Sequence, residues 1–150
     1  MRDSRLAGST AENIFLCILN ERGVFATSFD TVAFDGIVYD TNRRYFKVGG
    51  SPHYMQIKCR GSEGKHYNPQ GHSRNTIDGM QRVAQHLDIL ESSLYFVVGF
   101  YKQGDIRTAV YYGILLEELD RFKKAPTSQY RFSVERCEQE MKSDGAIFKF

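Results

Sequence analysis

The sequence predicts an α/β fold in which a mixed sheet is flanked by helices on both faces. Three observations predict it. A helical pattern of apolar residues opens the chain, segments of β character follow, and a second amphipathic segment leads into a long apolar run. Strands that alternate with a crossover helix form a sheet covered by helices. We therefore expect a helix, three strands, a helix and a strand, with additions at the C-terminus.

A first helix is predicted over residues 10–22, because apolar residues recur three or four positions apart and Gly23 stops the pattern. The repeating positions are Ile14, Phe15, Ile18 and Leu19. Two strands should follow, over residues 24–29 and 32–39, because both segments are rich in aromatic and β-branched residues.

Residues 54–60 alternate between polar and apolar side chains, which is typical of a strand with one polar face. The polar face carries Tyr54, Gln56, Lys58 and Arg60, and the opposite face carries Met55, Ile57 and Cys59. Residues 61–76 are rich in Gly, Ser, Asn and His and are expected to form a long loop. Loops of that length inside a compact domain are usually functional.

A second helix is predicted over residues 78–90, where apolar residues form one helical stripe. The stripe consists of Met80, Val83, Ala84, Leu87 and Leu90. Residues 94–101 are almost continuously apolar, as expected for a buried central strand. A further strand over residues 106–112 should pair with it through a turn at Gln103, Gly104 and Asp105.

The C-terminal part shows weaker patterns. A short helix is expected over residues 115–122 and another near residues 134–141. Tyr111 and Tyr112 are expected in the core or at a subunit interface.

The length and composition are those of one globular domain over residues 1–150. With 41% hydrophobic and 25% charged residues, the chain resembles neither a disordered segment nor collagen nor a coiled coil. The longest apolar runs, such as residues 94–98, are too short to cross a bilayer. No apolar segment follows the charged residues 1–8, so no secretion signal is expected.

The net charge and the cysteines exclude few further classes of protein or site. Cys17, Cys59 and Cys137 are few and widely spaced, which favours reduced thiols in the cytoplasm and argues against a zinc site. A net charge of +2 does not by itself predict a nucleic-acid partner. A case for DNA must rest on a catalytic cluster and on local charge.

Four polar residues lie at positions where they could form a catalytic cluster. Asp35 lies within an otherwise apolar predicted strand, and Gln56 and Lys58 share one face of the next strand. Glu12 lies in the first turn of the predicted first helix. If the two strands are neighbours in a hairpin, facing side chains come within about 5 Å of one another. The sequence therefore predicts that these groups converge.

Phosphodiester hydrolysis requires such a set. A hard cation such as Mg²⁺ (or Mn²⁺) takes oxygen ligands, which Asp35, the amide of Gln56 and the carbonyl of Ile57 can supply. Lys58 can donate a hydrogen bond to the attacking water and stabilise charge on the phosphate. Glu12 can bind a second metal or orient water at the first. We interpret Glu12, Asp35, Gln56 and Lys58 as the catalytic residues.

Each residue also has a purely structural interpretation. Glu12 follows Ser9 by three positions, which is the spacing of a helix capping box. Asp35 precedes Gly36 and can be a turn residue, while Gln56 and Lys58 can form a solvated strand face. It is their combination, in this order along the chain, that favours catalysis.

Three stretches, "GSTAENIFLCILNERG", "FDGIVYD" and "YMQIKCR", resemble the PD-(D/E)xK nuclease superfamily, and more narrowly its homing endonucleases from bacterial group I introns. The resemblance implies a restriction-endonuclease-like core. It implies Asp35 as metal ligand, Lys58 as catalytic lysine and Glu12 as the helix carboxylate. It also implies a sequence-specific endonuclease that cuts double-stranded DNA with Mg²⁺.

The sequence departs from the family pattern at two positions. Gln56 stands where the family usually has an acidic residue, and Phe34 precedes Asp35 where the family has proline. Glutamine is neutral and a weaker metal ligand than a carboxylate. The change can mean weaker metal affinity, a single metal or an inactive relative, and Glu12 would restore one negative charge.

Basic and amide side chains flank the predicted site and are expected to bind DNA. One group lies between the second and third strands: Arg43, Arg44 and Lys47. The other follows the third strand: Arg60, Lys65, His66, Asn68, Gln70, His72, Arg74 and Asn75. The alternatives are a solvated polar loop, or an HNH-like metal site at His66, Asn68 and His72, whose spacing does not fit one.

Cutting both strands of a duplex needs two active sites, so a homo-oligomer is expected, at least a dimer and for a long target a tetramer. Residues 115–150 are the candidate subunit contact. Three other functions stay open: a structure-specific nuclease like a Holliday junction resolvase, a catalytically inactive DNA-binding module, which Gln56 motivates, and a structural oligomer without a nucleic-acid role.

Overall fold

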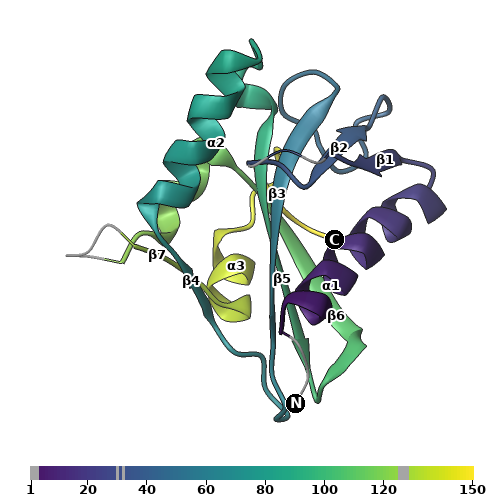
Figure 1. Cartoon of the computed structure of the whole chain (residues 1–150), viewed down its shortest axis with the longest axis vertical. Helices are drawn as coiled ribbons and strands as arrows, with labels where there is room; N and C mark the ends of the chain where they lie inside the picture. The colour runs from purple at the N-terminus through teal and green to yellow at the C-terminus, as the bar shows by residue number, and fades with distance from the viewer. Residues whose placement is uncertain (1–3, 30, 32, 125–128) are drawn as a thin grey trace.

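Within the described residues, a six-stranded mixed sheet runs through the molecule in the order β1-β2-β3-β5-β6-β8 (Figure 1). The computed structural model describes residues 4–29, 31, 33–124 and 129–150, with only the backbone of residues 4–9. Strands β3 and β5 are parallel, and the other neighbouring pairs are antiparallel. A small second sheet pairs β4 with β7.

The strands of the main sheet are β1 (Phe25–Ser28), β2 (Gly36–Tyr39), β3 (His53–Gly61), β5 (Leu94–Lys102), β6 (Asp105–Leu115) and β8 (Ile147–Lys149). The small sheet consists of β4 (Gln70–His72) and β7 (Tyr130–Phe132). The α-helices are α1 (Ser4–Glu21), α2 (Arg74–His86) and α3 (Val134–Glu140), and the 3₁₀ helices are η1 (Glu91–Ser93) and η2 (Leu116–Phe122).

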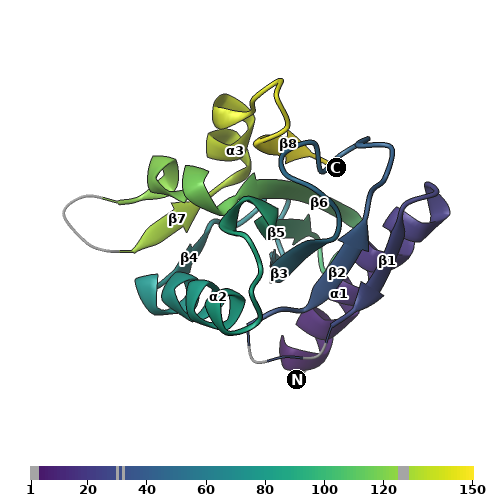
Figure 2. The same ribbon diagram turned by 90° about the horizontal axis from the view of Figure 1, so that it is seen from above.

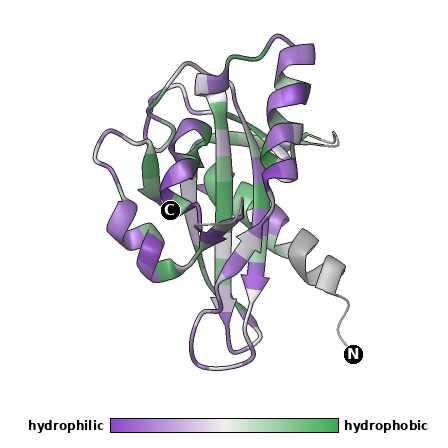
Figure 3. Cartoon of the chain, turned by 90° about the vertical axis from the view of Figure 1, so that its left-hand side faces the viewer, coloured by the Kyte–Doolittle hydropathy of each residue, from purple (hydrophilic) through white to green (hydrophobic). Residues whose placement is uncertain are grey.

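Helices cover both faces of the main sheet, as the sequence predicts. Helix α1 lies on one face, and α2 lies on the other with the small sheet, η2 and α3 (Figure 2). On the α1 face, Phe15 and Leu19 belong to the same buried cluster as Met55 and Ile57 of β3. The hydrophobic colour concentrates on the central strands, and the hydrophilic colour on helix faces and loops (Figure 3). The fold class predicted from the sequence is confirmed.

Strand β3 separates its side chains between the two faces. Met55 and Ile57 point into the α1 core, whereas Tyr54 packs against the core on the α2 side. Because side chains alternate along a strand, Gln56 and Lys58 lie on the same face as Tyr54. The predicted polar face of β3 is therefore turned towards α2 and β4.

Helix α1 begins earlier than predicted. It starts at Ser4, so Glu12 does not lie in the first turn, and Ser9 lies inside the helix instead of capping it. The capping-box interpretation of Ser9 and Glu12 is therefore wrong. The segment before Ser9 contains Leu6 and Ala7, which favour helix, and no proline that would stop it.

Helix α2 is displaced from its predicted range. It begins at Arg74, directly after the extended residue Ser73, and ends at His86. Asp88 then takes a positive φ of 55°, which turns the chain away from the helix axis. Leu87 and Leu90 are consequently 49% and 74% exposed, so the last part of the predicted apolar stripe does not pack.

Strand β2 is shorter than predicted. Its expected first residue, Val32, lies outside the described residues, and the strand begins at Gly36. The N–H groups of Ala33 and Phe34 both donate hydrogen bonds to the hydroxyl of Thr31, at 3.3 and 3.0 Å, which forms a local turn. Asp35 therefore precedes the strand.

The sequence does not predict β4 and β8. Strand β4 lies within the expected loop over residues 61–76 and consists of Gln, Gly and His, which have little β propensity. Its partner β7 lies far along the chain. Strand β8 is added to β6, and Gly113 permits this, because a Cβ there would lie 2.5 Å from the ring of Phe148.

Other predicted elements are confirmed. Strands β5 and β6 form a hairpin whose turn residues Gln103 and Gly104 have φ of 58° and 59°, as a tight two-residue turn requires. Tyr111 and Tyr112 are buried in the core. Cys17, Cys59 and Cys137 are free thiols.

Among the described residues, no helix has both the length and the apolar character needed to span a bilayer.

Asp40 holds the connection from β2 to β3. Its side chain is 2% exposed, and its carboxylate accepts hydrogen bonds from the N–H groups of Arg44, Tyr45 and Phe46 at 3.1, 2.7 and 3.0 Å. We predict that Asp40→Ala lowers the free energy of unfolding by about 2–3 kcal/mol, because one buried and two partly buried backbone N–H groups lose a charged acceptor. Urea denaturation measures this. Asp40→Asn, which keeps one acceptor oxygen, should lose less, and equal stability of Asp40→Ala and the parent would contradict the assignment.

Candidate active site

A hydrogen bond between a side chain and the neighbouring strand positions Asp35. Its carboxylate Oδ2 accepts a hydrogen bond from the N–H of Ile57 at 2.8 Å, and its own N–H donates to the carbonyl of Met55 at 2.9 Å. Strand β2 pairs with β3 only from Gly36 opposite Met55 onwards, so the β2-side edge of β3 is open beyond Met55 in the described structure. Asp35 lies opposite the segment 56–58, as the sequence predicts.

Glu12 reaches this edge from α1. The hydroxyl of Tyr111 donates a hydrogen bond to the carbonyl of Ala11 at 3.0 Å and anchors this part of the helix to β6. Helix α1 also approaches β2 closely, because a Cβ at Gly36 would lie 3.0 Å from Leu16 Cδ2. Residues four apart lie on one helix face, so Glu12 projects one turn before Leu16, beside Asp35.

The pKa values of the two carboxyl groups show their mutual proximity. Burial raises the pKa of Glu12 to about 7; the Asp35 carboxylate adds to the increase and the Lys58 ammonium opposes it. Burial also raises the pKa of Asp35, against the lowering effects of the Ile57 N–H and Lys58. Two partly buried carboxyl groups near one ammonium leave an excess of negative charge that a bound cation would neutralise.

Gln56 supplies an oxygen without a partner. Its Oε1 is buried and accepts no hydrogen bond. A buried acceptor left unsatisfied costs about 1–3 kcal/mol, and an amide oxygen is a normal ligand of hard cations. The N–H of Ile57 faces Asp35, and the carbonyl of a strand residue points to the same edge as its N–H. The Ile57 carbonyl thus adds an oxygen at the Asp35 edge, and Gln56 Oε1, on the face of β3 that carries Lys58, is a further candidate ligand.

This donor set fits a hard cation. Within the described residues, no three His, Cys, Asp or Glu side chains form a metal-binding group, so the two carboxylates would need the amide and carbonyl oxygens as further ligands. Oxygen-only ligation is typical of Mg²⁺ and Mn²⁺ and atypical of zinc. Of the predicted ligands, Glu12, Asp35 and Ile57 come together at one edge of β3, and Gln56 follows from its neighbouring position on the same strand.

Lys58 is available for chemistry. Its side chain is half-buried on the same face of β3 as Gln56, and no hydrogen bond or ion pair to its ammonium is found in the described part of the chain. It affects the pKa of Glu12, Asp35 and His72, so it lies within electrostatic reach of all three. The structure therefore groups Lys58 with the two carboxylates, as the sequence predicts.

Gln70 and His72 have a different role from the predicted one. Gln70 is 6% exposed and donates a hydrogen bond from its amide to the carbonyl of Gly99 at 2.9 Å, which turns its Oε1 towards His72 Nε2 at 2.7 Å. Because Oε1 can only accept, His72 Nε2 carries the proton. We therefore remove Gln70 from the residues expected to contact DNA.

His72 is a neutral neighbour of Lys58. Its ring packs against Phe96 and Phe132, with centroids 5.4 and 5.9 Å away. Burial lowers the pKa of His72 to about 4, and the Lys58 ammonium adds to the decrease. Sequence reasoning missed this contribution because β4, which carries His72, was expected to be loop.

The other residues expected to bind DNA separate into two groups. One group is exposed on β3, in the segment that follows it or in the first turn of α2: Arg60, Lys65, His66, Asn68, Arg74 and Asn75. The second group, Arg43, Arg44 and Lys47, is also exposed, but it lies in the connection between β2 and β3. The Arg44 guanidinium donates to the carbonyl of Arg22, about 15 Å along the helix from Glu12. Lys47 packs against Gly145. The structure does not bring these three to the catalytic cluster.

Glu12 makes the stability of the metal-free protein depend on pH. Its pKa in the folded state exceeds the unfolded value, so folding takes up a proton, and the parent loses stability as pH rises from about 4.5 to about 7. We predict that Glu12→Gln removes this loss and is more stable than the parent by roughly 1–2 kcal/mol near pH 8, after allowance for solvent screening.

Urea denaturation with a chelator present, between about pH 5 and about pH 8, measures the difference. Glu21→Gln, at the exposed end of the same helix, is the control. Parallel pH profiles for the parent and Glu12→Gln would contradict the placement of Glu12.

Comparisons with known proteins support the fold. No family model matches the chain, and no curated protein matches it. Among solved structures, 11 chains match. One is Hjc, a Holliday junction resolvase from the archaeal hyperthermophile Archaeoglobus fulgidus, with a TM-score of 0.54 and 12% identity over 95% of this chain and 98% of that one. At this identity the match shows the fold alone, and the chain has the restriction-endonuclease-like architecture that the sequence predicts.

Proposed function

We propose that this chain is a divalent-metal-dependent DNA endonuclease that hydrolyses phosphodiester bonds. The observation that carries the proposal is the convergence of Glu12, Asp35 and Lys58 at an open strand edge, beside the unpartnered oxygen of Gln56. The resolvase of similar fold adds support, since it acts on DNA junctions. An inactive DNA-binding module would have no need for an unsatisfied buried oxygen on the strand that carries the candidate catalytic lysine.

Glu12, Asp35, Gln56 and the Ile57 carbonyl would hold Mg²⁺ or Mn²⁺. When bound, the metal supplies Lewis-acid activation of water and phosphate. Gln56 is neutral, so Glu12 provides the second negative charge of the ligand set. The Ile57 N–H fixes Oδ2 of Asp35, so the carboxylate keeps its orientation without rearrangement.

Lys58 acts on the reacting groups directly. Its ammonium would donate hydrogen bonds to the attacking water and to a phosphate oxygen, which stabilises the negative charge that develops as the bond breaks. The neighbouring imidazole of His72 is neutral at physiological pH, so it adds no competing positive charge. The phosphate and water are therefore expected to bind on the α2-facing side of β3.

The proposal also concerns which kind of DNA is the substrate. The similarity to a Holliday junction resolvase favours four-way DNA junctions, which the sequence leaves as an alternative. The homing interpretation rests on the sequence resemblance, and no comparison supports it. Symmetric cleavage of either substrate needs two active sites, so we also propose that the chain works as a dimer or a higher homo-oligomer.

We predict metal-dependent cleavage of a four-way junction in preference to linear duplexes built from the same arm sequences. The substrates are incubated with Mg²⁺, with Mn²⁺ or with a chelator, and products are mapped on sequencing gels. Paired cuts near the branch point are expected only with metal. Cutting of one long linear sequence, with intact junctions, would favour the homing interpretation, whereas binding without metal-dependent cutting would leave only the inactive module.

We predict that Asp35→Asn and Lys58→Met each lower the single-turnover cleavage rate at least about 10²-fold, because each removes a group that contacts the metal or the phosphate. DNA affinity, measured with Ca²⁺ in place of Mg²⁺, should change little. Lys149→Ala, an exposed lysine on β8, should cut at the parent rate. Parent-like rates in either site variant would refute the assignment of that residue.

A further inference from the structure

The segment after β6 forms a basic cleft outside the catalytic cluster. Elements η2, β7 and α3 enclose a cleft of about 290 Å³. It is lined by Arg121, Phe122, Lys123, Lys124, Arg131, Ser133 and Arg136. Five of these side chains are cationic and none is acidic, which favours an anionic ligand.

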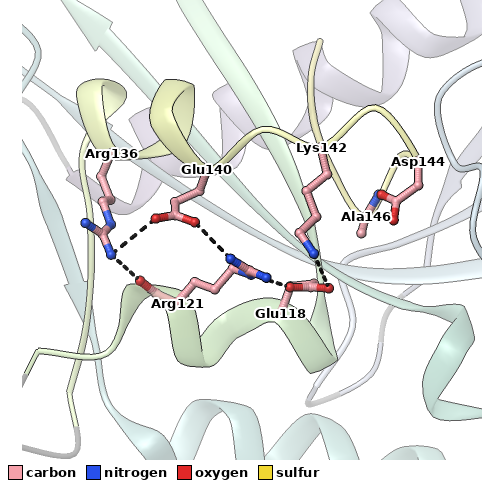
Figure 4. A network of polar contacts seen from close by, with 7 residues as sticks. All are labelled: Glu118, Arg121, Arg136, Glu140, Lys142, Asp144 and Ala146. Carbon is pink, nitrogen blue, oxygen red and sulfur yellow. Dashed lines mark hydrogen bonds and ion pairs between the residues drawn. The ribbon is translucent and has the colours of Figure 1, made fainter.

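Two of the cations are held in fixed positions (Figure 4). Arg121 bonds to Glu118 at 2.6 Å and to Glu140 at 3.4 Å, while Arg136 donates to the carbonyl of Arg121 at 2.8 Å and pairs with Glu140 at 3.3 Å. Exposed ion pairs of this kind add little to stability. Their effect here is to orient two guanidinium groups, which lowers the entropic cost of binding an anion.

The positive charge of the cleft is only partly neutralised, by the pairing of Glu118 and Glu140 with Arg121 and Arg136. Lys123 and Arg131 are exposed, and neither side chain has an acidic partner in the described part of the chain. Arg131 lies at the centre of β7, where Tyr130 and Phe132 point inwards and are buried. The strand therefore presents Arg131 to solvent on a rigid support.

The small sheet connects this cleft to the catalytic cluster. Arg131 is paired with Gly71 of β4, and the next residue, His72, lies beside Lys58. At the same end of β4, the Arg74 guanidinium donates to the hydroxyl of Tyr130 at 2.8 Å. Two cations lie along this connection: Arg74 at the start of α2, and Arg131 on the outer side of β7, whereas His72 between them is neutral. A DNA strand carries a phosphate about every 3.4 Å of helix axis, so phosphates beyond the scissile one can reach cations that lie away from the catalytic cluster.

We propose that the cleft formed by η2, β7 and α3 binds the phosphodiester backbone of DNA at a distance from the scissile phosphate. The inference rests on the proposed nuclease function. It assigns the cleft residues of η2, β7 and α3 to substrate binding, whereas the sequence suggested subunit contacts for residues 115–150. Phosphate contacts outside the cutting site position the substrate and carry no sequence information.

The test compares two double variants that lose equal charge. Lys123→Ala with Arg131→Ala removes the two unpartnered cations of the cleft, and Arg107→Ala with Lys149→Ala removes two exposed cations that do not line it. Binding of a four-way junction and of a linear duplex is measured in Ca²⁺ over a range of salt concentrations. The cleft variant should lower the salt slope by about two units on both substrates, and the control should leave it unchanged.

Position along the DNA is tested with methylphosphonates, which remove the charge of single phosphates. Substitutions outward from the cut should weaken binding of the parent and leave the cleft variant unaffected. An unchanged salt slope in the cleft variant would overturn the inference while leaving the nuclease proposal intact. A changed oligomeric state in sedimentation, with an unchanged slope, would assign the surface to subunit contact instead. If the parent binds neither DNA, the nuclease proposal itself fails.

Discussion

The hydrogen bond from the Ile57 N–H to the Asp35 carboxylate is the constraint on which the candidate site depends. It forms where β2 stops pairing with β3, so a side chain takes the place of the missing strand. The edge of a strand is where groups from both faces of a sheet can meet. Glu12 comes from the α1 face and Lys58 points to the α2 face, and Asp35 lies between them. A continuous β2 would cover this edge and separate the two.

The catalytic cluster lowers the stability of the metal-free protein, and the groups that lower it indicate what the cluster binds. Burial holds Glu12 partly protonated near neutral pH, Asp35 is shifted in the same direction, and Gln56 Oε1 has no donor. Each of these costs would be relieved by a cation among the oxygens. Functional sites commonly keep such local instability in an otherwise consistent fold. A solvated strand face, the structural alternative for Gln56, would leave its oxygen exposed to water.

The sequence predicts those features that depend on residues close together in the chain. The alternation along β3 placed Gln56 and Lys58 on one face, and the hairpin argument placed Asp35 opposite them. The sequence could not predict β4, because its three residues have weak propensity and become a strand only by pairing with β7. The misassigned role of Gln70 followed from that error. The sequence also does not predict the full length of α1, because Ser9 and Glu12 have the spacing of a capping box, which indicates a helix start that the structure does not have.

Substrate choice must come from outside the catalytic cluster, because the same set of carboxylates and lysine can cut any DNA phosphate that reaches it. Under the proposed function, we expect chain segments remote in sequence to control that access. Strands β4 and β7 lie over Phe96 next to the polar face of β3, and they continue into the basic surface of η2 and α3. A junction and a linear duplex differ in the direction of their arms and not in the chemistry of the scissile bond. Under the proposed function, we expect the arms of the substrate to run across β4 and β7, because these strands connect the polar face of β3 to the cations of η2 and α3.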